Sequence, residues 1–397
     1  MALCASRALA TTWFVAYSAV LPLTQTAWGL SSREAGLIQS AFMLGFTVSL
    51  FLVGFVSDHY GAKRAFLTTG VLMWASPITF VLFANSFWSA YWLHALTGLC
   101  AGGTYSPVLA LINEHIAKAR RGRANGLLIA SSSASYALCL GIAGLALKFT
   151  DWRGALGAVA ILPAMAWFVA LATLHETPNV VHTRPSGEKL LAALPSVLRD
   201  RRSMLSIWGY SFHNWELLGM WAWLPAFLTA ALGARGVSTA EAVSVSLTLS
   251  ALTFVANILG SILGGTMADR WGRTQTILVW SCASAALSLS IGWLIALPVP
   301  LLVLLACLYN FAAIADSSTH STVLGESVPP HMLGVTYSVR SVVGFGAGAI
   351  SPVVFGSVLD LAGGGSIPFA WGVAWTTLGL GAMFGPLATW KLHRATK

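Results

Sequence analysis

The chain contains the stretch GFVSDHYGAKR, from Gly54 to Arg64, and repeats its pattern in GTMADRWGRTQ, from Gly265 to Gln275. In each stretch a glycine is followed four positions later by an aspartate, seven positions later by a second glycine, and then by basic residues. The two copies are 211 positions apart. The paired positions are Gly54 with Gly265, Asp58 with Asp269, and Gly61 with Gly272. A spaced pattern that recurs at a constant offset indicates an internal duplication.

A second pair of acidic positions supports this duplication. In NEHIAKARRGR, Glu114 is followed eight residues later by Gly122, and in GESVPPHMLGV, Glu326 is followed eight residues later by Gly334. The offset is 212 here, which agrees with that of the first pair within one residue. We therefore expect two halves built on the same plan.

The composition indicates an integral membrane protein. Hydrophobic residues make up 56% of the chain and charged residues only 9%, and apolar runs recur along its whole length. Runs of this length predict membrane-spanning helices, because backbone polar groups in lipid must be hydrogen-bonded within each segment. We predict twelve spans, at residues 9–29, 35–56, 66–84, 88–113, 126–147, 153–174, 204–232, 242–264, 275–296, 301–325, 335–358 and 367–389.

The distribution of basic residues predicts the orientation of these spans. Of the 22 Lys and Arg residues, seventeen, Arg7 among them, fall on the side that carries both termini. The other side has only Arg33, Lys148, Arg153 and Arg235. Basic residues accumulate in cytoplasmic loops, so we expect both termini in the cytoplasm. The net charge of +9 then reflects topology, and no nucleic-acid partner is expected.

The first apolar run and the cysteines agree with a helical membrane protein. Arg7 precedes an apolar run that is too long for a cleaved signal peptide, so the first span is expected to remain. Four of the five cysteines lie within predicted spans and Cys4 lies at the end of one, which indicates no disulfide framework.

The duplication, the twelve spans and the loop signature together resemble the major facilitator superfamily, over essentially the whole chain. The resemblance implies an all-α integral membrane fold with two six-helix bundles, at residues 1–174 and 204–397, joined by a cytoplasmic linker at 175–203. It also implies a central cavity lined by the first, fourth, seventh and tenth spans. Transport would then proceed by alternating access, in a bacterial-type protein of the inner membrane.

The signature loops are candidate gating elements. An aspartate at a helix end can accept hydrogen bonds from the N-terminal amides of another helix, while neighbouring basic residues hold acidic groups. Such contacts would latch one conformation. The alternative is that these charges only anchor helix ends at the membrane surface. The candidate residues are Gly54, Asp58, Gly61, Lys63, Arg64, Glu114, Gly265, Asp269, Gly272, Arg273 and Glu326.

Two acid–histidine pairs fall inside predicted spans. Glu216 lies ~18 Å from the start of the seventh span, close to the middle of a bilayer core of ~30 Å, and His213 shares its helical face. Asp316 and His320 lie one helical turn apart in the tenth span. A carboxylate at this depth is costly unless it is protonated, paired or hydrated, which makes these residues candidates for proton coupling. A polar clamp between helices, and in principle a set of metal ligands, are the other interpretations.

Several further residues are candidates for the cavity. Arg340 lies ~9 Å into the eleventh span, where it could bind an anion or form a latch with Asp58; both interpretations stay open. Tyr17, Tyr105 and Trp223 are candidate wall residues on the presumed cavity helices. His94 is expected to be a helix-packing residue.

The expected function is secondary active transport of a small solute, best matched by an organic anion taken up together with protons. Proton-coupled efflux of a cationic or drug-like compound is the alternative. A membrane-embedded enzyme or a non-transporting receptor is disfavoured, because the loops hold no catalytic motif and the longest is about 29 residues. We expect no cofactor and no metal. The partners expected are the solute, protons and the lipid bilayer, and a duplicated chain can function as a monomer.

Overall fold

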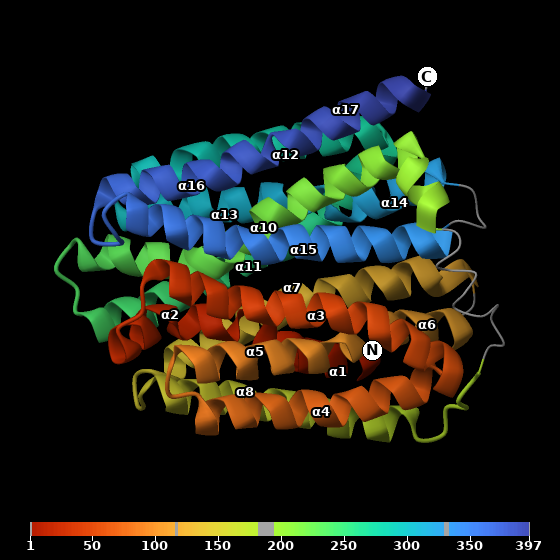
Figure 1. The fold of residues 1–397 in the computed structure, drawn as a ribbon, viewed down its shortest axis with the longest axis horizontal. Helices are drawn as coiled ribbons and strands as arrows, with labels where there is room; N and C mark the ends of the chain where they lie inside the picture. The colour runs from red at the N-terminus through yellow and green to blue at the C-terminus, as the bar shows by residue number, and fades with distance from the viewer. Residues whose placement is uncertain (1, 116–117, 182–193, 329–332, 397) are drawn as a thin grey trace.

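A computed structural model describes residues 2–115, 118–181, 194–328 and 333–396, except for the side chains at 54, 55, 58, 113, 118–126, 129, 327, 333, 334 and 396. Long helices run side by side across the molecule (Figure 1). The first half contains α1 (Ala2–Ala10), the 3₁₀ turn η1 (Thr11–Val15), α2 (Ala16–Trp28), α3 (Ser32–Tyr60), α4 (Ala62–Phe83), α5 (Phe87–Ala101), η2 (Gly102–Thr104), α6 (Ser106–His115), α7 (Lys118–Ala146) and α8 (Trp152–Leu174). The second half contains α10 (Arg201–Gly233), α11 (Thr239–Trp271), α12 (Arg273–Ile291), η3 (Gly292–Leu294), α13 (Val299–Ala315), α14 (Ser317–Ser327), α15 (Leu333–Leu361), α16 (Pro368–Ala382) and α17 (Phe384–Thr396).

The prediction of an all-α membrane fold is confirmed. Within the described residues, nine helical segments are long and apolar enough to cross a bilayer. Two other predicted spans are irregular. The first is interrupted by η1, and the last is divided between α16 and α17. The fifth corresponds to the single helix α7, whose described side chains include the apolar part Ala130–Ala146.

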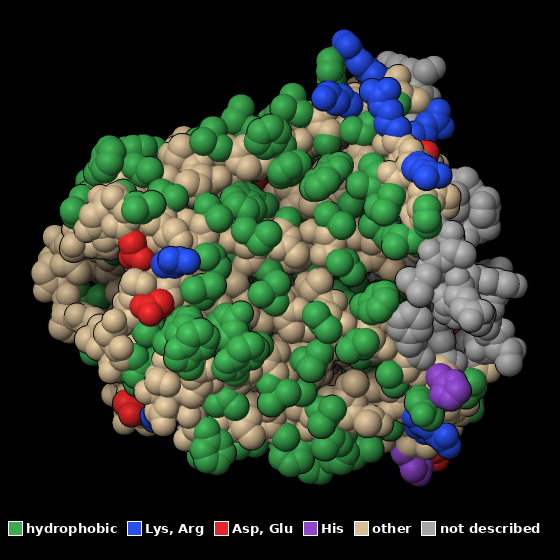
Figure 2. All heavy atoms as spheres, viewed as in Figure 1, with side chains coloured by type: hydrophobic (Ala, Val, Ile, Leu, Met, Phe, Trp, Pro, Cys, Tyr) green, Lys and Arg blue, Asp and Glu red, His purple; other side chains and the backbone are tan. Residues whose placement is uncertain are grey.

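The outer surface matches this environment. Hydrophobic side chains cover most of the face shown in Figure 2, and the charged side chains on that face gather toward its two ends. Large apolar residues such as Phe168 (65% exposed) and Leu304 (54% exposed) face outward. Such a broad apolar surface would be unfavourable in water and is favourable against lipid.

Helices of the two halves meet in the middle of the molecule. The helices of the first half, red to yellow in Figure 1, lie mostly below those of the second half, green to blue. Helix α3 packs along α15, and α7 packs along α11. The predicted linker at 175–203 includes residues 182–193, which lie outside the described part of the chain.

The signature glycines turn the chain sharply between consecutive helices. Gly61, between α3 and α4, has φ +88°, and Gly272, between α11 and α12, has φ +93°. Side chains with a Cβ rarely adopt these angles, which explains why both copies need glycine. The predicted tight turns are confirmed.

Other glycines allow close contact between helices. A Cβ on Gly45 of α3 would lie 2.1 Å from the carbonyl oxygen of Ala95 in α5, and one on Gly264 of α11 would lie 1.8 Å from that of Ala315 in α13. In each half, a glycine thus lets the helix of the second span touch the helix of the fourth span, α3 with α5 and α11 with α13. Gly348 of α15 similarly approaches α10, as the glycine-rich eleventh span predicts.

One end of the molecule is closed by a contact between the halves. The carboxylate of Asp360, near the end of α15, accepts hydrogen bonds from the backbone N–H groups of Ser32 (2.9 Å) and Arg33 (2.8 Å) at the start of α3. Beside them, Gly356 and Gly36 let the two helices touch, since added Cβ atoms would lie 2.2 Å and 2.4 Å from carbonyl oxygens of the partner helix. The second half therefore caps a helix of the first half.

Candidate functional site

A buried carboxylate stands at the centre of the candidate site. Asp316, 1% exposed, occupies the break between α13 and α14. One of its oxygens lies 2.9 Å from Nδ1 of His213 in α10. The other accepts a hydrogen bond of 2.5 Å from the hydroxyl of Ser281 in α12 and lies 3.4 Å from Nε2 of His320 in α14. Three helices and both predicted histidines thus converge on one acid.

The second acid, Glu216, lies one helical turn after His213 on α10. Glu216, 3% exposed, accepts a hydrogen bond of 2.8 Å from the hydroxyl of Ser284 in α12 and interacts electrostatically with Asp316 and Tyr309. Ser284 follows Ser281 by three residues, so both serines face the same side of the bundle. The two acids therefore share one polar strip, which the sequence analysis did not identify on α12.

This arrangement suits proton transfer. Histidine and carboxylate groups in hydrogen-bond contact can exchange a proton, and in a dry interior their charges stabilise each other. His213, Asp316 and His320 are also the described residues that could hold a metal ion, because their ligand atoms lie within 4.8 Å of one another. A metal ion here would compete with the Ser281 hydroxyl, which already donates a hydrogen bond to Asp316, whereas proton transfer between the carboxylate and the two imidazoles needs no added group.

Arg340 lies beside this network. It is 4% exposed, its guanidinium carbon is 4.2 Å from the centre of the Tyr210 ring and 5.0 Å from that of Tyr337, and one NH group donates to the hydroxyl of Ser321 at 2.7 Å. Its Nε has no hydrogen-bond partner in the described part of the chain. The geometry therefore leaves donors for an anion. Its predicted contact with Asp58 concerns a side chain outside the described residues.

A second buried arginine corrects the sequence analysis. The interpretation of Arg7 as a loop residue was wrong: α1 begins at Ala2, and Arg7 is 6% exposed inside the bundle. Its guanidinium donates to the carbonyl oxygen of Thr104 and, at 3.0 and 3.3 Å, to the hydroxyl of Ser132. It also lies 5.2 Å from the centre of the Tyr105 ring. These partners on η2 and α7 stabilise the guanidinium group inside the bundle.

Two predicted wall residues lie apart from the acid–histidine network. Tyr17 interacts with Thr24, whose hydroxyl donates to it at 3.4 Å, and packs 5.5 Å from the ring of His94. The indole N–H of Trp223 donates to the carbonyl oxygen of Pro352 at 3.0 Å, and its ring stacks on Phe355. Both side chains are almost fully buried and serve helix packing in this conformation.

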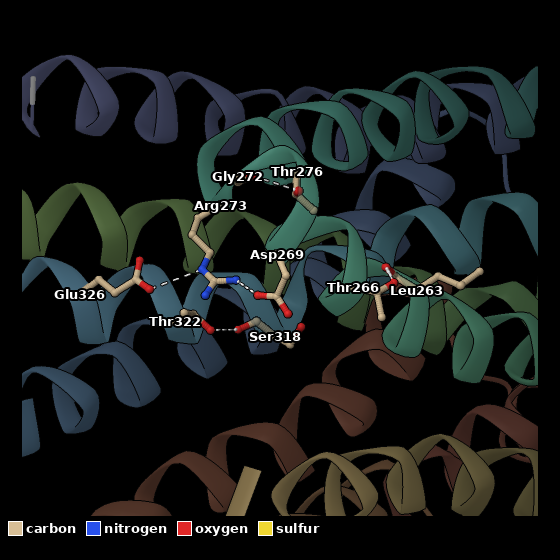
Figure 3. A network of polar contacts seen from close by, with 9 residues as sticks. All are labelled: Leu263, Thr266, Asp269, Gly272, Arg273, Thr276, Ser318, Thr322 and Glu326. Atoms are coloured by element: carbon tan, nitrogen blue, oxygen red, sulfur yellow. Dashed lines mark hydrogen bonds and ion pairs between the residues drawn. The ribbon is translucent and has the colours of Figure 1, made fainter. Parts of the chain in front are cut away.

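The second signature loop forms a polar cluster (Figure 3). The guanidinium of Arg273 forms an ion pair with Asp269 in its own loop and lies 3.4 Å from the carboxylate of Glu326 at the end of α14. A Cβ added to Gly265, one turn before Asp269, would lie 3.9 Å from the hydroxyl oxygen of Ser318 in α14, an ordinary contact distance. Arg273 therefore ties the loop between α11 and α12 to the end of α14.

The first signature loop makes different contacts. The amine of Lys63 donates to the carbonyl oxygens of His175 (3.2 Å) and Thr177 (2.8 Å), after the end of α8. The backbone N–H of Arg64 donates to the side chain of Asn179 at 3.2 Å. The surroundings of Gly54 and the side chain of Asp58 lie outside the described part of the structure, and a carboxylate oxygen of Glu114 lies 3.9 Å from Nδ1 of His115.

A buried amide network joins the halves near their centre. Ser133 of α7 donates to Asn257 of α11 at 2.6 Å, and the Asn257 amide donates to Asn310 of α13 at 2.7 Å. Asn310 also accepts from the indole of Trp221 at 3.2 Å. This network could not be predicted from the sequence, because single asparagines in apolar spans do not show which helices meet.

Comparison with known proteins shows to which family the chain belongs. The sequence profile of the Major Facilitator Superfamily matches residues 3–352. The chain belongs to this family. Its curated relatives in the Major Facilitator Superfamily include a probable sulfoacetate transporter of Cupriavidus necator, 24% identical over 94% of this chain and 90% of that protein. They also include a hexuronate transporter of Bacillus subtilis, 24% identical over 88% and 84% of the two chains, and a cis,cis-muconate transport protein of Acinetobacter baylyi, 26% identical over 86% and 81%.

Solved structures of Major Facilitator Superfamily transporters share the fold. The nucleoside transporter NupG superposes with a TM-score of 0.77 at 13% identity, covering 99% of this chain and 98% of that one. The xylose transporter XylE from E. coli superposes with a TM-score of 0.73 at 14% identity, covering 98% and 96%. The prediction of a twelve-helix transporter, rather than an enzyme, is confirmed.

Proposed function

We propose that this protein carries a small organic anion into a bacterial cell together with protons, as a monomer in the inner membrane with both termini in the cytoplasm. The proposal rests on one observation, which is that the site contains both a buried acid–histidine group and a buried arginine. Asp316 lies between two imidazoles. Arg340 lies over the ring of Tyr210, which contacts the ring of His320, and has no carboxylate within ion-pair distance among the described residues. The curated relatives support an anionic solute, since sulfoacetate, hexuronate and muconate are all organic anions.

The coupling between proton binding and anion binding is explained by the charges of the site and of the solute. An anion that binds at Arg340 neutralises the guanidinium but meets the negative charge of nearby carboxylates. Protonation of Asp316, Glu216 or a histidine lowers that repulsion, so proton and anion favour each other's binding. A loaded site with little net charge is also easier to move between the two sides of a low-dielectric membrane.

The signature loops are proposed to bias the alternation. The Arg273 contacts with Asp269 and Glu326 involve exposed side chains, so each contributes little to stability in isolation. Their role would be to hold α11, α12 and α14 in one arrangement and to release it during transport. The same role is proposed for Asp58 in the first half.

Efflux of a cation by proton exchange is the second candidate. It is favoured by the two buried carboxylates, Glu216 and Asp316, which could bind a positive charge when they are ionised. The two functions predict opposite effects of pH on ligand binding.

A thermal-shift screen of the purified protein at pH 5.5 and pH 7.5 tests this proposal, because a ligand that binds the folded state raises its melting temperature. We expect stabilisation by organic anions that is stronger at pH 5.5 and is lost in Arg340→Gln. Arg235→Gln is the control, since that arginine is exposed, lies after the end of α10 and donates to the carbonyl oxygens of Ile295 and Leu297, away from the acid–histidine network. Stabilisation by lipophilic cations that is stronger at pH 7.5 would instead support efflux.

A further inference from the structure

A basic hollow lies between the start of α10 and the end of α17. Its lining residues are Arg201 of α10 and Trp390, Lys391, Arg394 and Ala395 of α17. Lys and Arg side chains gather at the end of the molecule where α17 ends (Figure 1, Figure 2). The hollow has a volume of about 260 Å³, far above the ~10–15 Å³ that a single water molecule requires. It therefore has room for a small charged group.

Contacts between the two helices build this hollow. One NH₂ group of Arg202 donates to the carbonyl oxygen of Ala395 at 2.9 Å, which ties the start of α10 to the end of α17. The guanidinium carbon of Arg394 lies 3.7 Å from the centre of the Trp390 ring, so this side chain is held against the helix. Further along both helices, the rings of Phe212 in α10 and Phe384 in α17 are 5.2 Å apart. The basic side chains are thus presented by two helices that pack against each other.

The positive charge of the hollow is not balanced by the described residues. Arg201, Lys391 and Arg394 form no ion pair within the described part of the chain. The carboxylate of the neighbouring Asp200 instead accepts hydrogen bonds from the backbone N–H and the hydroxyl of Ser203, at 2.8 and 2.6 Å. Like charges in one hollow repel each other, so a bound anion would stabilise them. Guanidinium groups match the oxygens of a phosphate, and lysine binds phosphate as a point charge.

Exposed apolar side chains continue from the hollow along both helices. On α17, Phe384 (53% exposed) and Leu387 (51% exposed) precede Lys391 and Arg394 at intervals of three or four residues, so all four share one face. On α10, Trp208 (44% exposed) lies two turns after the arginine that begins the helix, on the same face. Each helix thus changes from apolar to basic side chains toward the same end. A phospholipid has the same order, from acyl chains to phosphate.

We propose that this hollow binds the phosphate of an anionic phospholipid, whose acyl chains lie along Phe384, Leu387 and Trp208. Basic pockets between membrane helices are suited to such headgroups. A soluble phosphate would have the same charge but would make no contact with the apolar side chains, so the lipid is the occupant that uses both parts of the surface. Because α10 and α17 both belong to the second half, a bound lipid would stabilise that half without joining it to the first.

The test compares two lipids with identical acyl chains. Binding of dioleoyl phosphatidylglycerol and of dioleoyl phosphatidylcholine to the purified full-length protein is measured by native mass spectrometry. We expect the first phosphatidylglycerol to bind about ten times more tightly than the first phosphatidylcholine. In the double variant Arg201→Gln/Lys391→Gln this preference should fall to within about twofold.

The matched control removes the same two charges elsewhere. Lys148 follows α7 and Arg270 lies in the last turn of α11, and both side chains are exposed. The double variant Lys148→Gln/Arg270→Gln should keep the wild-type preference. Equal affinity of the wild-type protein for the two lipids, or an equal loss of preference in the two double variants, would overturn the proposal.

Two further measurements separate the source of the phosphate and the role of the charges. Glycerol 1-phosphate is added at millimolar concentration to lipid-free protein. If it raises the melting temperature as much as phosphatidylglycerol does, the site binds a soluble phosphate and the lipid proposal is wrong. The variant Arg201→Lys/Lys391→Arg keeps both charges and should keep the preference for phosphatidylglycerol. A loss as large as that of the glutamine variant would show that these side chains only shape the helix ends. No solute takes part in these measurements, so their outcome does not affect the proposed transport function.

Discussion

Replacing Asp360 with alanine should weaken the contact that closes one end of the molecule. Its two carboxylate oxygens accept hydrogen bonds from the backbone N–H groups of Ser32 and Arg33, at 2.9 and 2.8 Å, at the start of α3. A capping side chain contributes about 0.5–2 kcal/mol. The interaction of a carboxylate with a helix N-terminus contributes about 0.3–1 kcal/mol. Because the site is partly exposed, we expect about 1–2 kcal/mol in total, which changes a two-state ratio by about 5–30-fold.

The direction of the change follows from the topology. Asp360 belongs to the second half and α3 to the first, so the hydrogen bonds can form only while this end is closed. Their loss should increase the population that is open at this end. Electron–electron distance measurements between spin labels on the exposed residues Ala27 and Phe369, in a cysteine-free background, would report that population directly.

The matched control is Glu34→Gln. Glu34 caps the same helix from within its own half, since its carboxylate accepts from the backbone N–H of Ser31 at 2.9 Å. That bond can persist in open and closed states alike, so this variant should leave the distance distribution unchanged. An Asp360→Ala protein with the wild-type distribution, or a Glu34→Gln protein with an equal shift, would refute the reasoning.

Three further variants probe other parts of the molecule. Glu216→Gln should abolish pH-gradient-driven uptake while solute exchange continues; gradient-driven uptake at the wild-type rate would remove Glu216 from the coupling site. Asp269→Asn breaks an exposed ion pair worth about 0–1 kcal/mol. It should change turnover several-fold with little effect on solute affinity, and a large loss of affinity alone would reject a gating role. Gly264→Ala places a Cβ 1.8 Å from the carbonyl oxygen of Ala315 and should lower the unfolding free energy by about 1–3 kcal/mol, measured by thermal melting. Gly141→Ala, with nothing within 4 Å, is its control and should melt like the wild type.

The fold could be predicted because its signals are local in sequence. Apolar runs mark the spans, and the repeated glycine and aspartate spacing marks the duplication without knowledge of any contact. Gly61 and Gly272 were identified from spacing alone, and both have the positive φ that the turn requires. The breaks in the first and last spans were missed, because η1 and the junction at Met383 interrupt sequences that remain apolar throughout.

The candidate site was predictable only in part. His213, Asp316 and His320 stood out because ionisable groups inside a span are costly, and the structure brings these three together. Ser281 and Ser284 did not stand out, since serine is common in membrane helices and its role depends on which helix it faces. Arg7 was misinterpreted because a basic residue at the edge of an apolar run usually lies at the membrane surface; its burial depends on partners about 100 residues away.

The central claim, that organic anions enter together with protons, is tested most directly by proton flux in proteoliposomes. A pH-sensitive dye is enclosed in vesicles that contain the purified protein, and the anion that stabilises the protein most is added outside at equal pH on both sides. We expect the vesicle interior to acidify when the anion is added, and Glu216→Gln vesicles to show no such change. Uptake of the labelled anion without any change of internal pH, or with alkalinisation, would contradict proton symport.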